Sequence, residues 1–290
     1  MKTPSNLVRD CRRYYAGELE KIYGSDEANA LIMILLEHYF DINRVKIALE
    51  PELRLSESEL LTLHFAVKEL LKNKPIQYII GVTDFCGLQF HVDENVLIPR
   101  PETEEIVQKI AHSAETMCTS SVHILDIGTG SGCIAISLAK LIKNSDVTAI
   151  DISEKALEVA KKNAEVNDVN VNFVHADILN PEEGLSNQKF DIIVSNPPYV
   201  CESEKKDMRA NVLDYEPATA LFVSDDDPLL FYRKILEFSQ KNLRKDGEIW
   251  FEINEKLGLE TKKLCIDENF INVEIISDYR GKDRIVKVVL

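Results

Sequence analysis

From Val122 onward, short runs of β-branched and apolar residues alternate with segments of helical spacing. This rhythm is typical of βαβ units, which build a parallel sheet with helices on both faces. It predicts an α/β, Rossmann-like fold with seven strands, of which the final one runs antiparallel. The predicted strands are 122–127, 147–152, 171–175, 190–195, 248–253, 273–277 and 284–290, and the helices between them are 133–143, 153–167, about 228–243 and 257–268.

The first part of the chain has a different period. Leu31, Ile32, Leu35 and Leu36 follow helical spacing, which predicts one buried stripe. Ser56 with Glu59 three residues later predicts a capping box at the start of another helix, which Pro75 is expected to end. Residues 1–75 are therefore predicted to form a small helical bundle.

Between the two parts, alternating apolar residues over 78–98 are interrupted by Gly81 and Gly87, which predicts a β-hairpin. We thus expect a bundle over 1–75, a hairpin linker over 76–105 and a catalytic domain over 106–290.

The composition of the chain argues against several classes of protein and of site. The chain of 290 residues has 34 Lys+Arg and 49 Asp+Glu, a net charge of −15, which argues against tracking a nucleic-acid backbone. The longest apolar run, 30–36, is far shorter than the ~20 residues that span a bilayer, so a cytoplasmic protein without membrane contact is expected. The six cysteines lack a Cys-x-x-Cys pair, so we expect reduced thiols and no metal site.

A glycine-rich loop follows the strand predicted over 122–127. Its Gly-x-Gly-x-Gly spacing differs from the dinucleotide fingerprint, whose third glycine would stand at Cys133, and this favours S-adenosylmethionine over NAD. A tight turn alone could also use these glycines, but Asp151 at the next strand end can accept from ribose hydroxyls. Asp177 either binds an adenine amine or forms a turn before Pro181. The loop residues are Gly128, Thr129, Gly130, Ser131 and Gly132.

The strand over 190–195 leads into Asn196-Pro197-Pro198-Tyr199, at the sheet edge where open α/β sheets place their sites. An amide or ring-bound amino nitrogen is a poor nucleophile, because its lone pair is delocalised. Two acceptors, the Asn196 side-chain oxygen and the Pro197 carbonyl, could orient its two N–H groups. The prolines stiffen the loop, and Tyr199 offers a flat face to a planar group. The pattern indicates an amino or amide methyltransferase.

With these motifs, the chain resembles the S-adenosylmethionine-dependent glutamine methyltransferases that modify the Gly-Gly-Gln motif of peptide-chain release factors. The resemblance covers roughly 75–290. Besides the glycine loop, Asp151 and the Asn196 motif, it rests on Pro75-Ile76-Gln77-Tyr78-Ile79-Ile80-Gly81, Phe85-Cys86-Gly87, Val96-Leu97-Ile98-Pro99-Arg100-Pro101-Glu102-Thr103-Glu104 and Gly281-Lys282-Asp283-Arg284.

The resemblance implies a class I methyltransferase fold and assigns roles. The glycine loop would hold the methionine part of the cofactor and Asp151 its ribose, while Asn196, Pro197, Pro198 and Tyr199 would form the glutamine pocket. Asn196 would also touch the cofactor. Two positions depart from many relatives: Ile178 stands where a tryptophan flanks the adenine, and Asn254 where glycine is common.

Arg100 and Glu102 precede the catalytic domain and could cover the site or pair with each other. We keep both outside the catalytic set.

Direct in-line transfer without metal, by a monomer whose bundle grips a class-1 release factor, is the favoured interpretation. A ribosomal-protein glutamine methyltransferase would use the same four residues, so the chemistry does not choose between these substrates. A DNA amino methyltransferase and a non-catalytic S-adenosylmethionine-binding module are the remaining alternatives.

Overall fold

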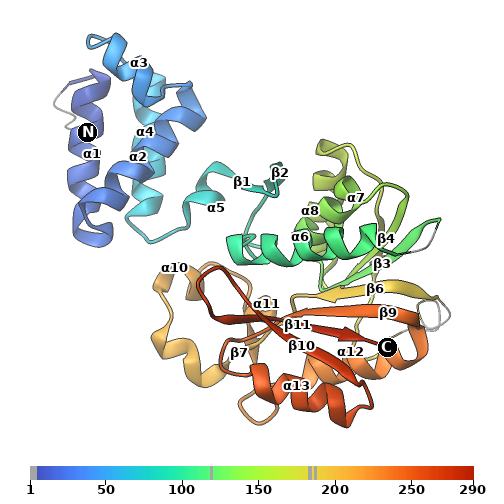
Figure 1. Ribbon diagram of the computed structural model, residues 1–290. Coiled ribbons are helices and arrows are strands. Elements are labelled where there is room, and N and C mark those ends of the chain that lie inside the picture. Colours follow the sequence, from blue (N-terminus) through green and yellow to red (C-terminus); the bar gives the residue numbers. More distant parts are fainter. Residues whose placement is uncertain (1–4, 118–119, 182–184, 186–187) are drawn as a thin grey trace. The chain divides into compact units, whose positions relative to one another are not determined.

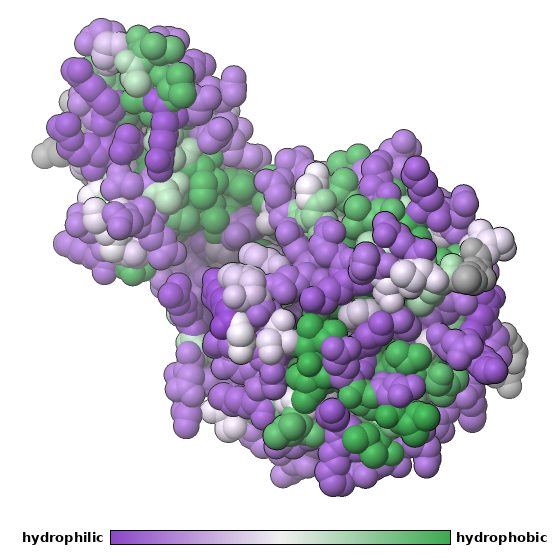
Figure 2. All heavy atoms as spheres, viewed as in Figure 1, coloured by the Kyte–Doolittle hydropathy of each residue, from purple (hydrophilic) through white to green (hydrophobic). Residues whose placement is uncertain are grey.

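The computed structural model describes residues 5–117, 120–181, 185 and 188–290 (Figure 1). These form two compact units: one contains the described residues up to Gly81 together with Ala210–Tyr215, and the other contains the remaining described residues. Within the described ranges, no helix is long and apolar enough to cross a membrane. On the face seen in Figure 2, hydrophilic residues cover most of the surface, in keeping with the high content of charged residues.

The first unit is a helical bundle with its own apolar core. The predicted stripe of Leu31, Ile32, Leu35 and Leu36 is buried. Its helices are α1 (Val8–Tyr23), α2 (Ser25–Phe40), α3 (Arg44–Leu49), α4 (Glu57–Leu70), α5 (Ile76–Ile80) and α10 (Ala210–Leu213).

The predicted capping box is confirmed at the start of α4. The Ser56 main-chain N–H donates to Glu59 Oε2 at 2.7 Å, and the Glu59 N–H donates to Ser56 Oγ at 3.3 Å. The predicted end of this helix at Pro75 is wrong, because the chain leaves the helical region earlier, at Asn73, whose φ is 64°. Pro75 instead precedes the first residue of α5, where its missing N–H costs no helical hydrogen bond.

The hairpin is present but shorter than predicted. Strands β1 (Val82–Phe85) and β2 (Leu88–His91) pair antiparallel, and Cys86 and Gly87 form the turn with φ of 51° and 73°. Two consecutive residues with positive φ match the twist of antiparallel strands. The residues of the predicted 76–105 linker fall into both units: α5 belongs to the first, and the hairpin and the start of α6 (Pro101–Glu115) to the second.

The second unit contains the predicted seven-stranded sheet, in the order β10-β11-β9-β6-β3-β4-β5. Strand β11 pairs antiparallel with both β10 and β9, and the other pairs of neighbours are parallel, so the α/β fold with an antiparallel final strand is confirmed. The strands are β3 (Val122–Ile127), β4 (Ser145–Asp151), β5 (Asn172–His175), β6 (Phe190–Ser195), β9 (Leu243–Glu252), β10 (Asn272–Ser277) and β11 (Asp283–Val289).

Helices cover both faces of this sheet (Figure 1). The core on one face joins the sheet to α6 and α7, and the core on the other joins it to α12 and α13. Alternate residues of β3 serve the two faces, with Ile124 in one core and Leu125 in the other. The helices are α7 (Cys133–Leu141), α8 (Glu154–Val166), α12 (Leu230–Asn242) and α13 (Gly258–Asp267).

Five short elements between β6 and α12 were not predicted. They are β7 (Val200–Cys201), the 3₁₀-helix η1 (Glu202–Asp207), α10 (Ala210–Leu213), α11 (Ala218–Leu221) and β8 (Phe222–Val223).

Candidate active site

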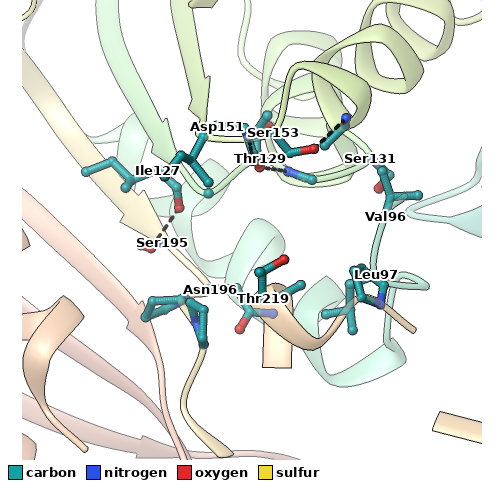
Figure 3. Close-up of a pocket in the computed structure, with 18 of the residues that line it drawn as sticks. Val96, Leu97, Ile127, Thr129, Ser131, Asp151, Ser153, Ser195, Asn196 and Thr219 are labelled. Carbon is teal, nitrogen blue, oxygen red and sulfur yellow. Dashed lines mark hydrogen bonds between the residues drawn. The ribbon is translucent and has the colours of Figure 1, made fainter. Parts of the chain in front are cut away.

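The carboxyl ends of four parallel strands, β3, β4, β5 and β6, border one cavity of about 480 Å³ within the second unit (Figure 3). Cavities of this size hold small molecules. Most of the predicted site residues line it: Gly128, Thr129, Gly130, Ser131, Asp151, Asp177, Ile178, Asn196, Pro197 and Pro198. Gly132 and Tyr199 lie outside this lining.

The glycine loop is tied to the end of β4. The N–H groups of Gly128 and Thr129 donate to the Ile150 carbonyl at 2.9 and 3.0 Å, and the Gly130 N–H donates to Asp151 Oδ2 at 2.8 Å. Gly128 and Gly130 have φ of 74° and 56°, and a Cβ added to either would meet no atom within 4 Å. The loop therefore presents bare backbone beside open space, as close approach of a ligand requires.

Gly132 has a packing role. A Cβ at this position would lie 2.8 Å from Ile136 Cδ1 and 3.1 Å from Ala160 Cβ, so the glycine allows α7 and α8 to approach each other. The contact of Gly132 with the cofactor, which the resemblance implies, stays a prediction.

Asp151 keeps hydrogen-bonding capacity for a ligand. Its Oδ1 accepts from the Ser153 N–H at 2.9 Å and its Oδ2 from Gly130, which leaves a further lone pair on each oxygen. Burial raises the pKa of this carboxyl, and the backbone donors act against that rise. The arrangement fits a group that offers two adjacent hydroxyls.

Asp177 and Ile178 border the same cavity from the segment after β5. Asp177 Oδ1 accepts from the Leu179 N–H at 2.8 Å, which is the turn role that the sequence left open. Ile178 is buried and adds an apolar surface to the wall.

Asp126 is a site residue whose role the sequence did not reveal. It is fully buried beneath the glycine loop and accepts a hydrogen bond from Thr129 Oγ1 at 2.6 Å. Its other oxygen, Oδ1, has no hydrogen-bond partner among the described residues. Burial raises the pKa of Asp126 to about 7, against the smaller lowering effects of the Thr129 hydroxyl and the Ala135 backbone N–H.

The Asn196 motif lies across the cavity from the glycine loop. Ser195 Oγ donates to the Ile127 carbonyl at 2.7 Å and fixes the end of β6 against β3. Figure 3 shows Asn196 and Thr219 facing the side of the cavity formed by Thr129 and Asp151. Further lining residues that the sequence did not single out for the cavity include Glu94, Asn95, Thr219, Phe222 and Phe231.

The Tyr199 side chain is hydrogen-bonded to a buried carboxylate. Its hydroxyl donates to Glu252 Oε1 at 3.1 Å, and burial raises the pKa of the phenol. Asn254, one of the two departures noted above, donates from Nδ2 to the Tyr199 carbonyl at 3.3 Å and to Glu204 Oε2 at 2.9 Å.

Arg100 and Glu102 do not pair with each other. Arg100 Nη2 lies 2.6 Å from Glu216 Oε1, whose carboxylate also accepts from the Ile98 N–H at 3.2 Å. Glu102 lies 3.8 Å from Arg280 Nη1. The first ion pair braces the cavity wall, since Arg100 is among the lining residues.

Comparison with known proteins agrees with this geometry. The family described as a methyltransferase domain matches residues 119–269, and the PrmC N-terminal domain matches residues 10–81. A methyltransferase structure from Pyrococcus furiosus covers 77% of this chain and 95% of its own, with a TM-score of 0.51 and 24% identity, which shows the shared fold.

Curated relatives extend the match to nearly the full length. The release factor glutamine methyltransferase of Flavobacterium psychrophilum is 48% identical over 97% of this chain and 99% of its own. That of Bacteroides thetaiotaomicron is 44% identical over 94% and 96%. The chain belongs to the release factor glutamine methyltransferase family.

Proposed function

We propose that this protein methylates the side-chain amide nitrogen of the glutamine in the Gly-Gly-Gln motif of peptide-chain release factors. The observation that carries the proposal is the meeting of two predicted motifs on one cavity: the glycine loop with Asp151 on one side, and Asn196 with Pro197 on the other. The relatives' names support the substrate.

S-adenosylmethionine fits the residues present. The cavity is large enough for it, Asp151 retains lone pairs for ribose hydroxyls, and the loop at Gly128 and Gly130 leaves room where side chains would otherwise stand. Ile178 supplies an apolar surface for an adenine ring. When bound, the cofactor supplies a methyl group on a positively charged sulfur.

The chain's own residues would orient the acceptor. Asn196 Oδ1 and the Pro197 carbonyl can accept from the two N–H groups of the glutamine amide, which holds the nitrogen with its lone pair toward the cofactor side. The stiff Pro197-Pro198 pair keeps these acceptors in place. The amide nitrogen becomes strongly acidic once alkylated, so its proton leaves without a charged base.

We infer direct transfer, without a metal ion or a covalent intermediate on the protein, by a monomer whose helical unit binds the release factor. Because translation ends in the cytoplasm, the proposed substrate implies action there. A chelator is expected to leave the rate unchanged.

The test is transfer of radiolabelled methyl to a panel of purified release factors, ribosomal protein and duplex DNA. Label is expected on the release factor and is expected to disappear when its Gly-Gly-Gln glutamine is replaced or when the enzyme carries Asn196→Ala. Asn172→Ala, at an exposed position of β5, is the matched control and should retain activity. Label on ribosomal protein alone would reassign the substrate, and label on DNA alone would reject protein methylation.

A further inference from the structure

Glu252 is a buried carboxylate at the carboxyl end of β9, the strand beside β6. It is 2% exposed, and the preceding residue, Phe251, is paired with Ser195, the residue before the Asn196 motif. Burying a carboxylate is costly unless its oxygens are satisfied, so the partners of this side chain indicate its role.

Two hydroxyls satisfy the carboxylate, and both come from elements at the cavity. Tyr199 donates to Oε1 at 3.1 Å, and Thr103 Oγ1, from the first turn of α6, donates to Oε2 at 2.7 Å. Thr103 itself lines the cavity. A third hydroxyl, that of Tyr232 on α12, donates to the Glu252 carbonyl at 3.0 Å. One residue therefore joins the loop after β6 to two helices.

One of the charged groups near Glu252 is Arg284, from the Gly281–Arg284 motif, to which the proposed reaction assigns no role. Arg284 lies 3.4 Å from Asp278, and its positive charge lowers the pKa of Glu252 while burial, the larger effect, raises it. Glu102 is the like charge near this group.

We propose that Glu252 is a positioning residue for methyl transfer: by holding the Tyr199 hydroxyl, it fixes the far end of the Asn196–Tyr199 loop. The inference rests on the proposed function. The two prolines fix φ at Pro197 and Pro198, but rotation about ψ remains, so a hydrogen bond at Tyr199 is needed to keep the Asn196 oxygen directed at the amide.

Four variants test this. Tyr199→Phe removes the hydroxyl and keeps the ring. Glu252→Met removes both acceptor oxygens at similar side-chain length, whereas Glu252→Gln retains one acceptor for the tyrosine. Glu248→Met is the matched control, because Glu248 is also a buried carboxylate on β9. Its partners are Ser113, Trp250 and Lys287, none of which lines the cavity or belongs to the Asn196–Tyr199 loop.

With release factor as substrate, Tyr199→Phe and Glu252→Met are each expected to lower kcat about tenfold, while the KM for S-adenosylmethionine changes less than about twofold. Glu252→Gln should recover most of the rate. The double variant Tyr199→Phe/Glu252→Met should be no slower than Glu252→Met alone, because both changes remove one interaction. Glu248→Met should retain the wild-type kcat.

Other outcomes overturn the inference. Equal losses from Glu252→Met in the wild-type and Tyr199→Phe backgrounds would show independent action, and a Glu252→Met protein with full kcat would show no role. Failure of the wild-type chain to label release factor would instead reject the proposed function; the same comparison then applies to whichever panel member accepts label. If no panel member accepts label, both proposals fail.

Discussion

At the scale of single residues, two carboxylates at the ends of neighbouring strands differ in what they can bind. Asp151 has backbone donors on both oxygens and retains capacity for a ligand, whereas Asp126 is sealed beneath the glycine loop with one oxygen unpartnered. The charged form of Asp126 is therefore poorly compensated. Its protonation should affect how firmly the loop is held.

Asp126→Asn should reduce the pH dependence of stability. Because burial raises the folded-state pKa from 3.8 to about 7, this group favours folding fully below its unfolded pKa, and that contribution is lost as pH rises through 7. The effect is about 4 kcal/mol at most, at 1.36 kcal/mol per pKa unit. Thermal unfolding at about pH 5 and about pH 8 measures the part of this effect that is lost above pH 5, about 3 kcal/mol. A variant whose melting temperature falls as steeply as that of the wild type would contradict the assignment.

The sequence predicted those site residues whose position follows from the order of strands and loops along the chain. The glycine loop and Asn196-Pro197-Pro198 come directly after strands, and Asp151 is the last residue of one, so the sheet topology alone brings them together. It did not reveal the contact between Thr103 and Glu252, which lie 149 positions apart in the chain. It also could not tell that the Tyr199 hydroxyl points to Glu252 rather than to a ligand, since spacing does not encode the direction of a side chain.

At the scale of elements, the close approach of α7 and α8 sets the shape of the loop that precedes α7. Gly132 makes that approach possible, because any side chain would press on Ile136 and Ala160. Two effects oppose substitution here: the positive φ of 81° and the steric contact.

Gly132→Ala and Gly281→Ala separate these two effects. Both glycines have a φ near 80°, but a Cβ at Gly281 would meet nothing within 4 Å. We expect Gly132→Ala to lower the free energy of unfolding by about 1–3 kcal/mol more than Gly281→Ala, which is the cost of overpacking. Denaturant unfolding of both variants measures the difference. Equal losses would assign the whole cost to backbone strain.

Most elements with a full hydrophobic period were predicted, but helix α6 and the short elements were not. Strand β6 was predicted at its observed bounds, because its apolar run is bracketed by polar residues and the Asn-Pro turn. The elements η1 and α11 span six and four residues, too few to show a helical period. Helix α6 was missed although it spans 15 residues: its first five residues were assigned to the linker, and no helix was predicted over the rest.

At the scale of the whole molecule, chemistry and the helical bundle belong to separate units. Every residue that lines the cavity comes from the second unit. The first unit receives one later segment, Ala210–Tyr215, where the Tyr215 hydroxyl donates to the Lys72 carbonyl at 2.9 Å. Cofactor binding should therefore be separable from recognition of the protein substrate.

A chain beginning at Val82 should bind S-adenosylmethionine with a Kd within about threefold of the full chain. Its transfer to intact release factor should fall by at least about tenfold in kcat/KM, because the proposed contacts of the bundle are lost. Transfer to a short Gly-Gly-Gln peptide should change little, and serves as the control. Calorimetry and label transfer measure the two effects. Equal losses on the protein and the peptide would contradict a recognition role for the bundle.

The spacing of the strands in the sheet fixes the distance across the site. Asp151 ends β4 and Asn196 follows β6, with β3 between them, so their spacing is set by two interstrand steps of roughly 4.8 Å each. Side chains alternate between the two faces of each strand, so deleting one residue within β3, β4 or β6 would turn every later position of that strand to the opposite face. Natural variation in length should accordingly be rarer within these strands than between η1 and α12, where added residues leave the distances between the strands unchanged.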